Sequence, residues 1–132
     1  MGDLNYRLNT TFEELNNSNT LEALEMVGTR KEQLAASQMD GNYPNYTEPK
    51  IGFFPSYKMA FNDGMYIEKK NQAPSYTDRV LFKNNSNYQV LDEFYDCCHD
   101  VFGSDHRPVQ RAMTIKGFSQ PQFAEVGKLL GD

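Results

Sequence analysis

Apolar positions in the first third of the chain recur at helical spacing, and each run follows a helix start signal. A hydroxyl or amide residue is followed three positions later by glutamate at Thr11, Asn19 and Thr29, a pairing typical of the first turn of a helix. We expect short helices over residues 11–17, 20–27 and 29–39. The next segment, "DGNYPNYTEPK", contains two prolines and a glycine, so it is predicted to be a loop.

The rest of the chain has the pattern of extended segments separated by turns. "IGFFPSYKMAF" is aromatic and is followed by "NDG" at 62–64, a strong turn sequence that could close a hairpin with "MYIEKK". "SYTDRVLFK" is a strand candidate, "NNSN" at 84–87 is a turn before "YQVLDEFY", and "HRPVQRAMTI" alternates as a last strand. Short helices followed by about four or five strands predict a layered α/β structure.

Composition and charge narrow the class of partner. The chain has nine Phe and eight Tyr, which argues against disorder. Its net charge of −5 argues against a wide basic face for duplex DNA, yet residues 50–83 carry six basic and only three acidic groups. A small polyanion held by a few cations therefore fits. Two adjacent cysteines, Cys97 and Cys98, make no disulfide framework and indicate a reducing, cytoplasmic setting.

Three short motifs carry titratable or amide side chains. "GDLNY" contains Asp3 and Asn5, which would share one face if the segment is extended, and "PSYTDRV" contains Asp78. "GSDHRPV" places Asp105 and His106 between a Gly-Ser turn and the predicted last strand, where backbone geometry fixes side-chain direction. Singly, each motif could be a turn cap or a surface ion pair. Together and in this order they indicate chemistry.

In order and approximate spacing, "GDLNYRL", "FFPSYKM", "EKKNQAPSYTDRVL" and "FGSDHRPV" resemble the C-terminal motifs of the inositol polyphosphate 5-phosphatases, within the endonuclease/exonuclease/phosphatase superfamily. The resemblance implies the C-terminal half of a two-sheet α/β sandwich of the deoxyribonuclease/phosphatase type, over residues 1–117, with 118–132 a tail or the start of a following segment. The family's upstream motifs, an Asn on the first strand, a metal-binding Glu and a further His, are not found in the sequence. Met1 is therefore expected to be an internal residue or a mis-set start.

The resemblance also implies roles for the motif residues. Asp3 would orient or deprotonate the attacking water, and Asn5 would fix the nucleophile and the phosphate through its amide. Asp78 would hold the imidazole of His106, which would hydrogen-bond the scissile phosphate. Asp105 would sit beside a hard cation, Mg²⁺. Which carboxylate is the formal base stays open.

Recognition of the substrate would fall on the locally basic segment. By the same resemblance, Tyr57, Lys58 and Lys70 match positions that grip the phosphate next to the scissile one on the inositol ring. This chain departs from the family pattern in two ways: Asn71 stands where the family has Arg after the paired lysines, and one extra residue precedes Pro74. Both changes predict a weaker grip on the neighbouring phosphate.

The sequence therefore predicts part of a Mg²⁺-dependent 5-phosphatase acting on a phosphoinositide lipid or a soluble inositol polyphosphate. It would be cytoplasmic, with peripheral contact to membranes left open, and no nucleic acid is expected as a partner. Two alternatives stay open. A nuclease of the same superfamily would also carry "GDxN" and "SDH". A catalytically inactive interaction domain is the other, because the chain alone is expected to lack half of the catalytic domain and to be inactive.

Overall fold

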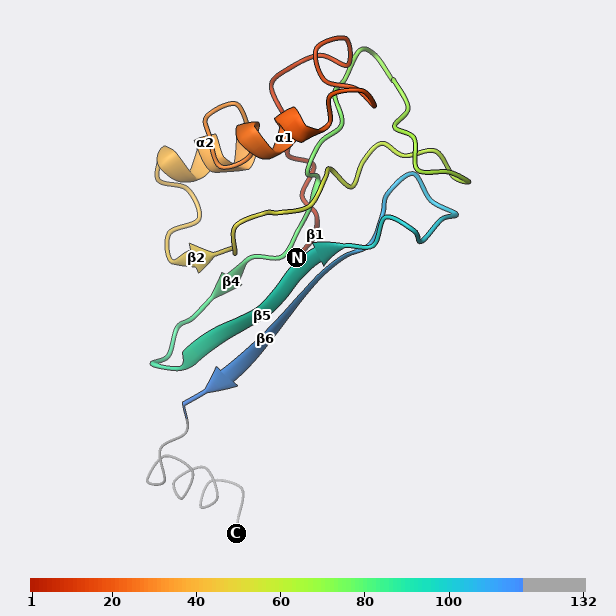
Figure 1. The fold of residues 1–132 in the computed structure, drawn as a ribbon. Helices are drawn as coiled ribbons and strands as arrows, with labels where there is room; N and C mark the ends of the chain where they lie inside the picture. Colours follow the sequence, from red (N-terminus) through yellow and green to blue (C-terminus); the bar gives the residue numbers. More distant parts are fainter. Residues whose placement is uncertain (118–132) are drawn as a thin grey trace.

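The computed structural model describes residues 1–117, so the tail expected over 118–132 lies outside the described residues. In chain order the elements are β1 (Gly2–Asp3), α1 (Leu21–Met26), α2 (Gln33–Met39), β2 (Tyr46–Thr47), β3 (Asp78–Arg79), β4 (Phe82–Lys83), β5 (Gln89–Cys97) and β6 (Val109–Lys116). In Figure 1 both helices lie together on one side of the strands, and β5 and β6 form one long hairpin. No helix in the described part is long and apolar enough to cross a membrane.

The strands form three antiparallel pairs, β1–β3, β2–β4 and β5–β6. The first pair joins segments far apart in the sequence and sets Asp3 opposite Asp78. The last pair confirms the strand predicted from alternation in "HRPVQRAMTI" and pairs it with "YQVLDEFY", with a register shift between Asp92 and Phe94. Because β6 begins at Val109, "SDH" lies at the entrance to this strand, as expected.

The helix expected over residues 11–17 is wrong. The capping contact forms, since the Glu14 amide donates to Thr11 Oγ1 at 3.2 Å. The chain then turns, because the side chain of Asn19 accepts a hydrogen bond from the amide of Asn16 and donates one to the carbonyl of Glu14. Asparagine side chains compete for backbone groups in this way and stop a helix from propagating.

The two other predicted helices form, but the second starts later than expected. The first matches α1 closely. The helix expected over 29–39 begins at Gln33, because residues 29–32 form a turn in which the Glu32 amide donates to the Thr29 carbonyl. Glu32 itself caps the helix by accepting from the amide of Ala35 at 2.6 Å. Glu32, which the sequence pattern placed inside a helix that starts near Thr29, is therefore the N-cap of α2.

A buried charged group ties the helical layer to the strands. Arg79 donates to Glu48 through two nitrogens, each at 2.7 Å, and also contacts Glu32. Burial alone would lower the pKa of Arg79, but the two carboxylates raise it above its ordinary value. Tyr95 joins the group by donating to Glu48 at 2.7 Å. Around it, Phe53 packs edge-on against the rings of Tyr76 and Tyr95.

The predicted hairpin at "NDG" is present as a tight turn. Met59 pairs with Tyr66, the Ala60 amide donates to the Met65 carbonyl at 2.8 Å, and residues 62–64 form the tip. Arg107, which is 1% exposed, holds this turn against the "SDH" loop. Its guanidinium donates to the carbonyls of Ser104, Ala60 and Asp63.

Candidate active site

Two carboxylates and an imidazole converge at the β1–β3 pair. The antiparallel register brings Asp3 and Asp78 together, and the strand entrance before β6 adds His106. One ligand atom from each of these three residues lies within 4.8 Å of the others. Among residues 1–117 this is the one group of three such side chains that could surround a metal ion. The structure thus brings together residues that the sequence placed in three separate motifs.

One oxygen of Asp78 is the hydrogen-bonding centre of the group. Asp78 Oδ2 accepts from His106 Nδ1 at 2.8 Å, from Ser56 Oγ at 2.6 Å and from Thr77 Oγ1 at 3.0 Å. With three donors on one oxygen, the carboxylate is fixed and that oxygen has little capacity left for a metal. The contact needed for Asp78 to orient the imidazole is therefore present.

His106 is held on its ring face as well as at Nδ1. Its ring stacks on Tyr57 with 4.4 Å between centroids and 30° between planes. The backbone of Tyr57 pairs with both Ser75 and His106. Because Nδ1 donates to Asp78, Nε2 is the free ring nitrogen, and it lies 3.7 Å from Asp3 Oδ2. The His106 side chain is 30% exposed, so a substrate can reach it.

Asn5 does not continue the strand, so the shared strand face that an extended segment would give Asp3 and Asn5 is absent. Strand β1 ends at Asp3, and Asn5 has a φ of 61°, in the left-handed region that asparagine tolerates. The two residues still meet, because the Asn5 amide donates to Asp3 Oδ1 at 2.9 Å. The Asn5 side chain accepts two hydrogen bonds from Arg7. A local turn, rather than the alternation of a strand, places this amide.

The remaining predicted residues lie outside the cluster of Asp3, Asp78 and His106. Lys58 is half-buried, and Lys70 is exposed with a φ of 53°. Asp105 is half-buried, and its carbonyl accepts from the Met59 amide at 2.8 Å. Among the described residues, none of these three side chains has a hydrogen bond or ion pair with protein. Their charged ends are therefore available to a ligand.

The donor set suits a hard cation. Carboxylate oxygens are the ligands that Mg²⁺ prefers, and Asp3 and Asp105 have oxygens not already occupied in the way that Asp78 Oδ2 is. Two carboxylates form only part of the usual shell, which would be completed by water, substrate phosphate and further protein groups. Within the cluster, Asp3 is the carboxylate that would hold the ion, while Asp105, the metal ligand that the resemblance implies, lies outside the cluster.

Sequence reasoning missed three side chains that organise the site. Ser56 and Thr77 fix the carboxylate of Asp78, and Arg7 contacts Asn5. Each is a direct neighbour of a singled-out residue or lies two positions from one. The one sequence signal for these residues is that each is a polar side chain close to a candidate site residue. Spacing alone does not show which way such a side chain points.

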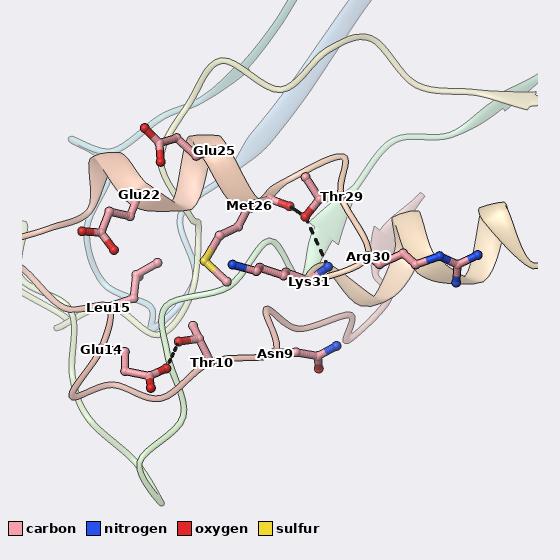
Figure 2. Close-up of a pocket in the computed structure, with 10 residues that line it drawn as sticks. All are labelled: Asn9, Thr10, Glu14, Leu15, Glu22, Glu25, Met26, Thr29, Arg30 and Lys31. Carbon is pink, nitrogen blue, oxygen red and sulfur yellow. Dashed lines mark hydrogen bonds between the residues drawn. The ribbon is translucent and has the colours of Figure 1, made fainter.

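One hollow in the described chain lies away from the site. It has a volume of about 690 Å³, is open to solvent and lies beside α1 (Figure 2). Some of its polar lining residues form hydrogen bonds with one another. The Thr10 hydroxyl donates to Glu14, and the Thr29 hydroxyl accepts from the Lys31 amide. None of the site residues lines it, whereas Asp78 and His106 line another hollow of about 510 Å³.

Proteins named as 5-phosphatases are similar in sequence to most of this chain. It is 34% identical over 120 residues to type IV inositol polyphosphate 5-phosphatase 11 of Arabidopsis thaliana, covering 88% of this chain and 36% of the relative. It is also 34% identical over 112 residues to the phosphatidylinositol 4,5-bisphosphate 5-phosphatase INP51 of Saccharomyces cerevisiae, covering 83% and 11%. The chain thus spans about a third or less of the length of these relatives.

Two solved structures share the fold. The inositol polyphosphate 5-phosphatase domain of SPsynaptojanin, solved with inositol (1,4)-bisphosphate and calcium, matches with a TM-score of 0.69 at 26% identity. The match covers 96% of this chain and 38% of that one, and it confirms the expected deoxyribonuclease/phosphatase-type fold for a partial domain. A Cimex nitrophorin in its ferrous NO complex matches with a TM-score of 0.73 at 26% identity, over 88% of this chain and 40% of that one.

The nitrophorin shows that one fold can serve different chemistry, so the fold alone does not decide function. Membership is decided by the sequence: the family model described as Endonuclease/Exonuclease/phosphatase family 2 matches residues 1–112. Because that match extends over most of the chain and the relatives above are inositol polyphosphate 5-phosphatases, this chain belongs to endonuclease/exonuclease/phosphatase family 2.

Proposed function

We propose that this chain is the C-terminal half, over residues 1–117, of the catalytic domain of a phosphoinositide or inositol polyphosphate 5-phosphatase. The observation that carries the proposal is the contact between His106 Nδ1 and Asp78 Oδ2 at 2.8 Å, with Asp3 on the other side of the ring. An imidazole oriented by one carboxylate and facing a second can act on a phosphate and on the water that attacks it.

The residues divide the work of hydrolysis among them. Asp3 accepts a hydrogen bond from the attacking water or takes its proton, and the side-chain amide of Asn5 donates to the phosphate. Asp78 holds His106 so that its Nε2 side faces the scissile phosphate. Mg²⁺ beside Asp105 would supply charge neutralisation for the phosphoryl group and the leaving oxygen. Phosphate monoesters hydrolyse extremely slowly without such help.

Substrate recognition belongs to two cations that have no protein partner among residues 1–117. Lys58 and Lys70 provide ammonium groups for the ring phosphate next to the scissile one, with Tyr57 beside them. Ammonium groups bind phosphate as compact point charges. The substrate class is a phosphoinositide headgroup, either on a membrane or as a free inositol polyphosphate. A cytoplasmic protein with peripheral membrane contact would meet both.

The test is hydrolysis by the protein in its natural length. We expect Mg²⁺-dependent release of inorganic phosphate from phosphatidylinositol 4,5-bisphosphate and no cleavage of duplex DNA. His106→Ala should lower kcat on the order of 10²–10⁴-fold with little change in KM, because an oriented donor acts in the transition state. His99→Ala is the matched control, since its ring contacts only the Phe54 carbonyl.

The outcomes separate the alternatives. DNA cleavage without phosphate release would identify a nuclease. Neither activity from the natural-length protein would favour the interaction domain. A His106→Ala enzyme that keeps kcat and only raises KM would show that His106 binds substrate without taking part in the chemistry.

A further inference from the structure

Arg7 contacts the candidate site without belonging to its chemistry. Its Nε and Nη2 atoms donate to Asn5 Oδ1 at 3.2 and 2.6 Å, and its Cζ atom lies 4.8 Å from the centroid of the Tyr57 ring. We propose that Arg7 is a positioning residue that fixes the side-chain amide of Asn5 with its NH₂ group directed at the phosphate. This inference rests on the proposed function.

The two ends of the Asn5 side-chain amide differ in their hydrogen bonding. An Asn side chain accepts through oxygen and donates through nitrogen, whereas a guanidinium can only donate. A flipped Asn5 amide would set its NH₂ group against the donors of Arg7, so the contact permits one orientation. Among residues 1–117, Asn5 Nδ2 has no hydrogen-bond partner. Two N–H donors are therefore left for an oxygen that only accepts, such as that of a phosphate.

Arg7 is itself held in place on several sides. Its amide donates to Gln33 Oε1 at 3.0 Å, and its carbonyl accepts from the Gln33 amide at 2.9 Å, which anchors it to the first residue of α2. Its guanidinium lies over Tyr57, the ring that stacks on His106. The contact with this ring thus helps to hold the guanidinium beside the Asn5 amide.

Two buried arginines show what a purely structural guanidinium does here. Arg79 pairs with two carboxylates, and Arg107 donates to three backbone carbonyls. Arg7 has no ion pair within the described chain, and its Nη1 is buried without a partner. Its side-chain hydrogen bonds both go to Asn5. Stability alone does not account for this arrangement, whereas control of one amide does.

The first measurement is kinetic, on the natural-length protein. Arg7→Met keeps much of the side-chain bulk but removes every donor. We expect kcat for phosphate release from phosphatidylinositol 4,5-bisphosphate to fall by about ten- to a hundredfold, because misplacing a catalytic group costs that order in rate. KM should change little. Arg7→Lys, which keeps one donor, should recover part of the loss. Arg30→Met, which removes an exposed pair with Asp40, should have no effect.

A double-mutant cycle tests whether Arg7 acts through Asn5. In an Asn5→Ala background there is no amide to position, so adding Arg7→Met should lower kcat less than twofold further. Losses that multiply in the double variant would mean that Arg7 acts independently of Asn5 and would overturn the proposal. Unchanged kcat in the single Arg7→Met variant would overturn it equally.

A measurement without substrate separates this proposal from the proposed function. Side-chain ¹⁵N relaxation of Asn5 should show a rigid NH₂ group in the wild-type protein and a mobile one in Arg7→Met, with the denaturation midpoint used to confirm folding. An amide that is equally rigid in both proteins overturns the positioning role. If the wild-type protein releases no phosphate, the proposed function fails, while the relaxation result still decides what Arg7 does.

Discussion

The carboxylate of Asp78 illustrates what a single residue can and cannot reveal in sequence. Its partnership with His106 could be predicted, because the motifs that contain the two residues are recognisable in order. The donors Ser56 and Thr77 on the same oxygen could not, since hydroxyls in "PSY" and "TDR" have many available partners. Nor could the left-handed turn at Asn5, which depends on a side-chain bond back to Asp3. Motifs identify candidate groups, and long-range contacts fix their direction.

Replacing Lys58 tests whether a single cation recognises the ring phosphate next to the scissile one. The Lys58 side chain has no protein partner within residues 1–117. If it binds the ring 4-phosphate, Lys58→Ala should lower kcat/KM for phosphatidylinositol 4,5-bisphosphate by about one to two decades, because a charged hydrogen bond is worth roughly 1.5–3 kcal/mol. The 3,5-bisphosphate, which lacks that group, should be spared.

Lys50→Ala is the matched control, since Lys50 is an exposed lysine of the same basic segment. It should change neither substrate. An equal loss on both substrates with Lys58→Ala would assign Lys58 a general electrostatic role. Asn71→Arg, which restores the family pattern, should increase the preference for the 4,5-bisphosphate.

At the scale of elements, the helix and strand predictions failed and succeeded for identifiable reasons. The β5–β6 hairpin was predictable because "HRPVQRAMTI" alternates after its proline and the turn at 84–87 marks where its partner begins. The helix over 11–17 failed because Asn16 and Asn19 bond to the backbone and to each other instead of extending the turn. The start of α2 was misplaced because Glu32 caps from outside the helix. Hydrogen bonds of polar side chains set these helix boundaries, and the pattern of apolar positions does not reveal such bonds.

Replacing Glu32 tests how much the buried charged group stabilises the helical layer. Glu32 is 0% exposed, caps α2 and pairs with Arg79. Glu32→Gln keeps an oxygen for the cap but removes the charge, so it should lower the free energy of unfolding by about 1.5–3 kcal/mol. Urea unfolding of the natural-length protein followed by circular dichroism measures this.

The exposed Glu22 of α1 offers the comparison. Glu22→Gln should change the free energy of unfolding by less than about 0.5 kcal/mol, as surface substitutions usually do. If Glu32→Gln were as mild as Glu22→Gln, Glu48 alone would be sufficient to stabilise Arg79 in the interior.

At the scale of the whole molecule, the described chain leaves apolar surface uncovered. Leu91 and Phe94 on β5 are 40% and 49% exposed, and Ile115 on β6 is 51% exposed. The cluster of Asp3, Asp78 and His106 offers two carboxylates, fewer ligands than an octahedral Mg²⁺ site requires. Both observations support the proposal that a further part of the catalytic domain supplies a packing surface and further ligands.

We therefore expect the 132-residue chain by itself to show no Mg²⁺-dependent release of phosphate from phosphatidylinositol 4,5-bisphosphate. The natural-length protein, assayed beside it at equal concentration, should be active. Turnover by the isolated chain would contradict the expectation that it lacks half of the catalytic machinery.

The His106–Asp78 contact also provides a spectroscopic reporter. The chain has two histidines, and only His106 has a ring nitrogen bonded to a carboxylate. A ring proton held in such a bond is strongly deshielded and slow to exchange with solvent, so it should give an isolated proton resonance far downfield. His106→Ala would assign it. Following that signal during refolding would show when the strand entrance and the β1–β3 pair come together, before any substrate is present.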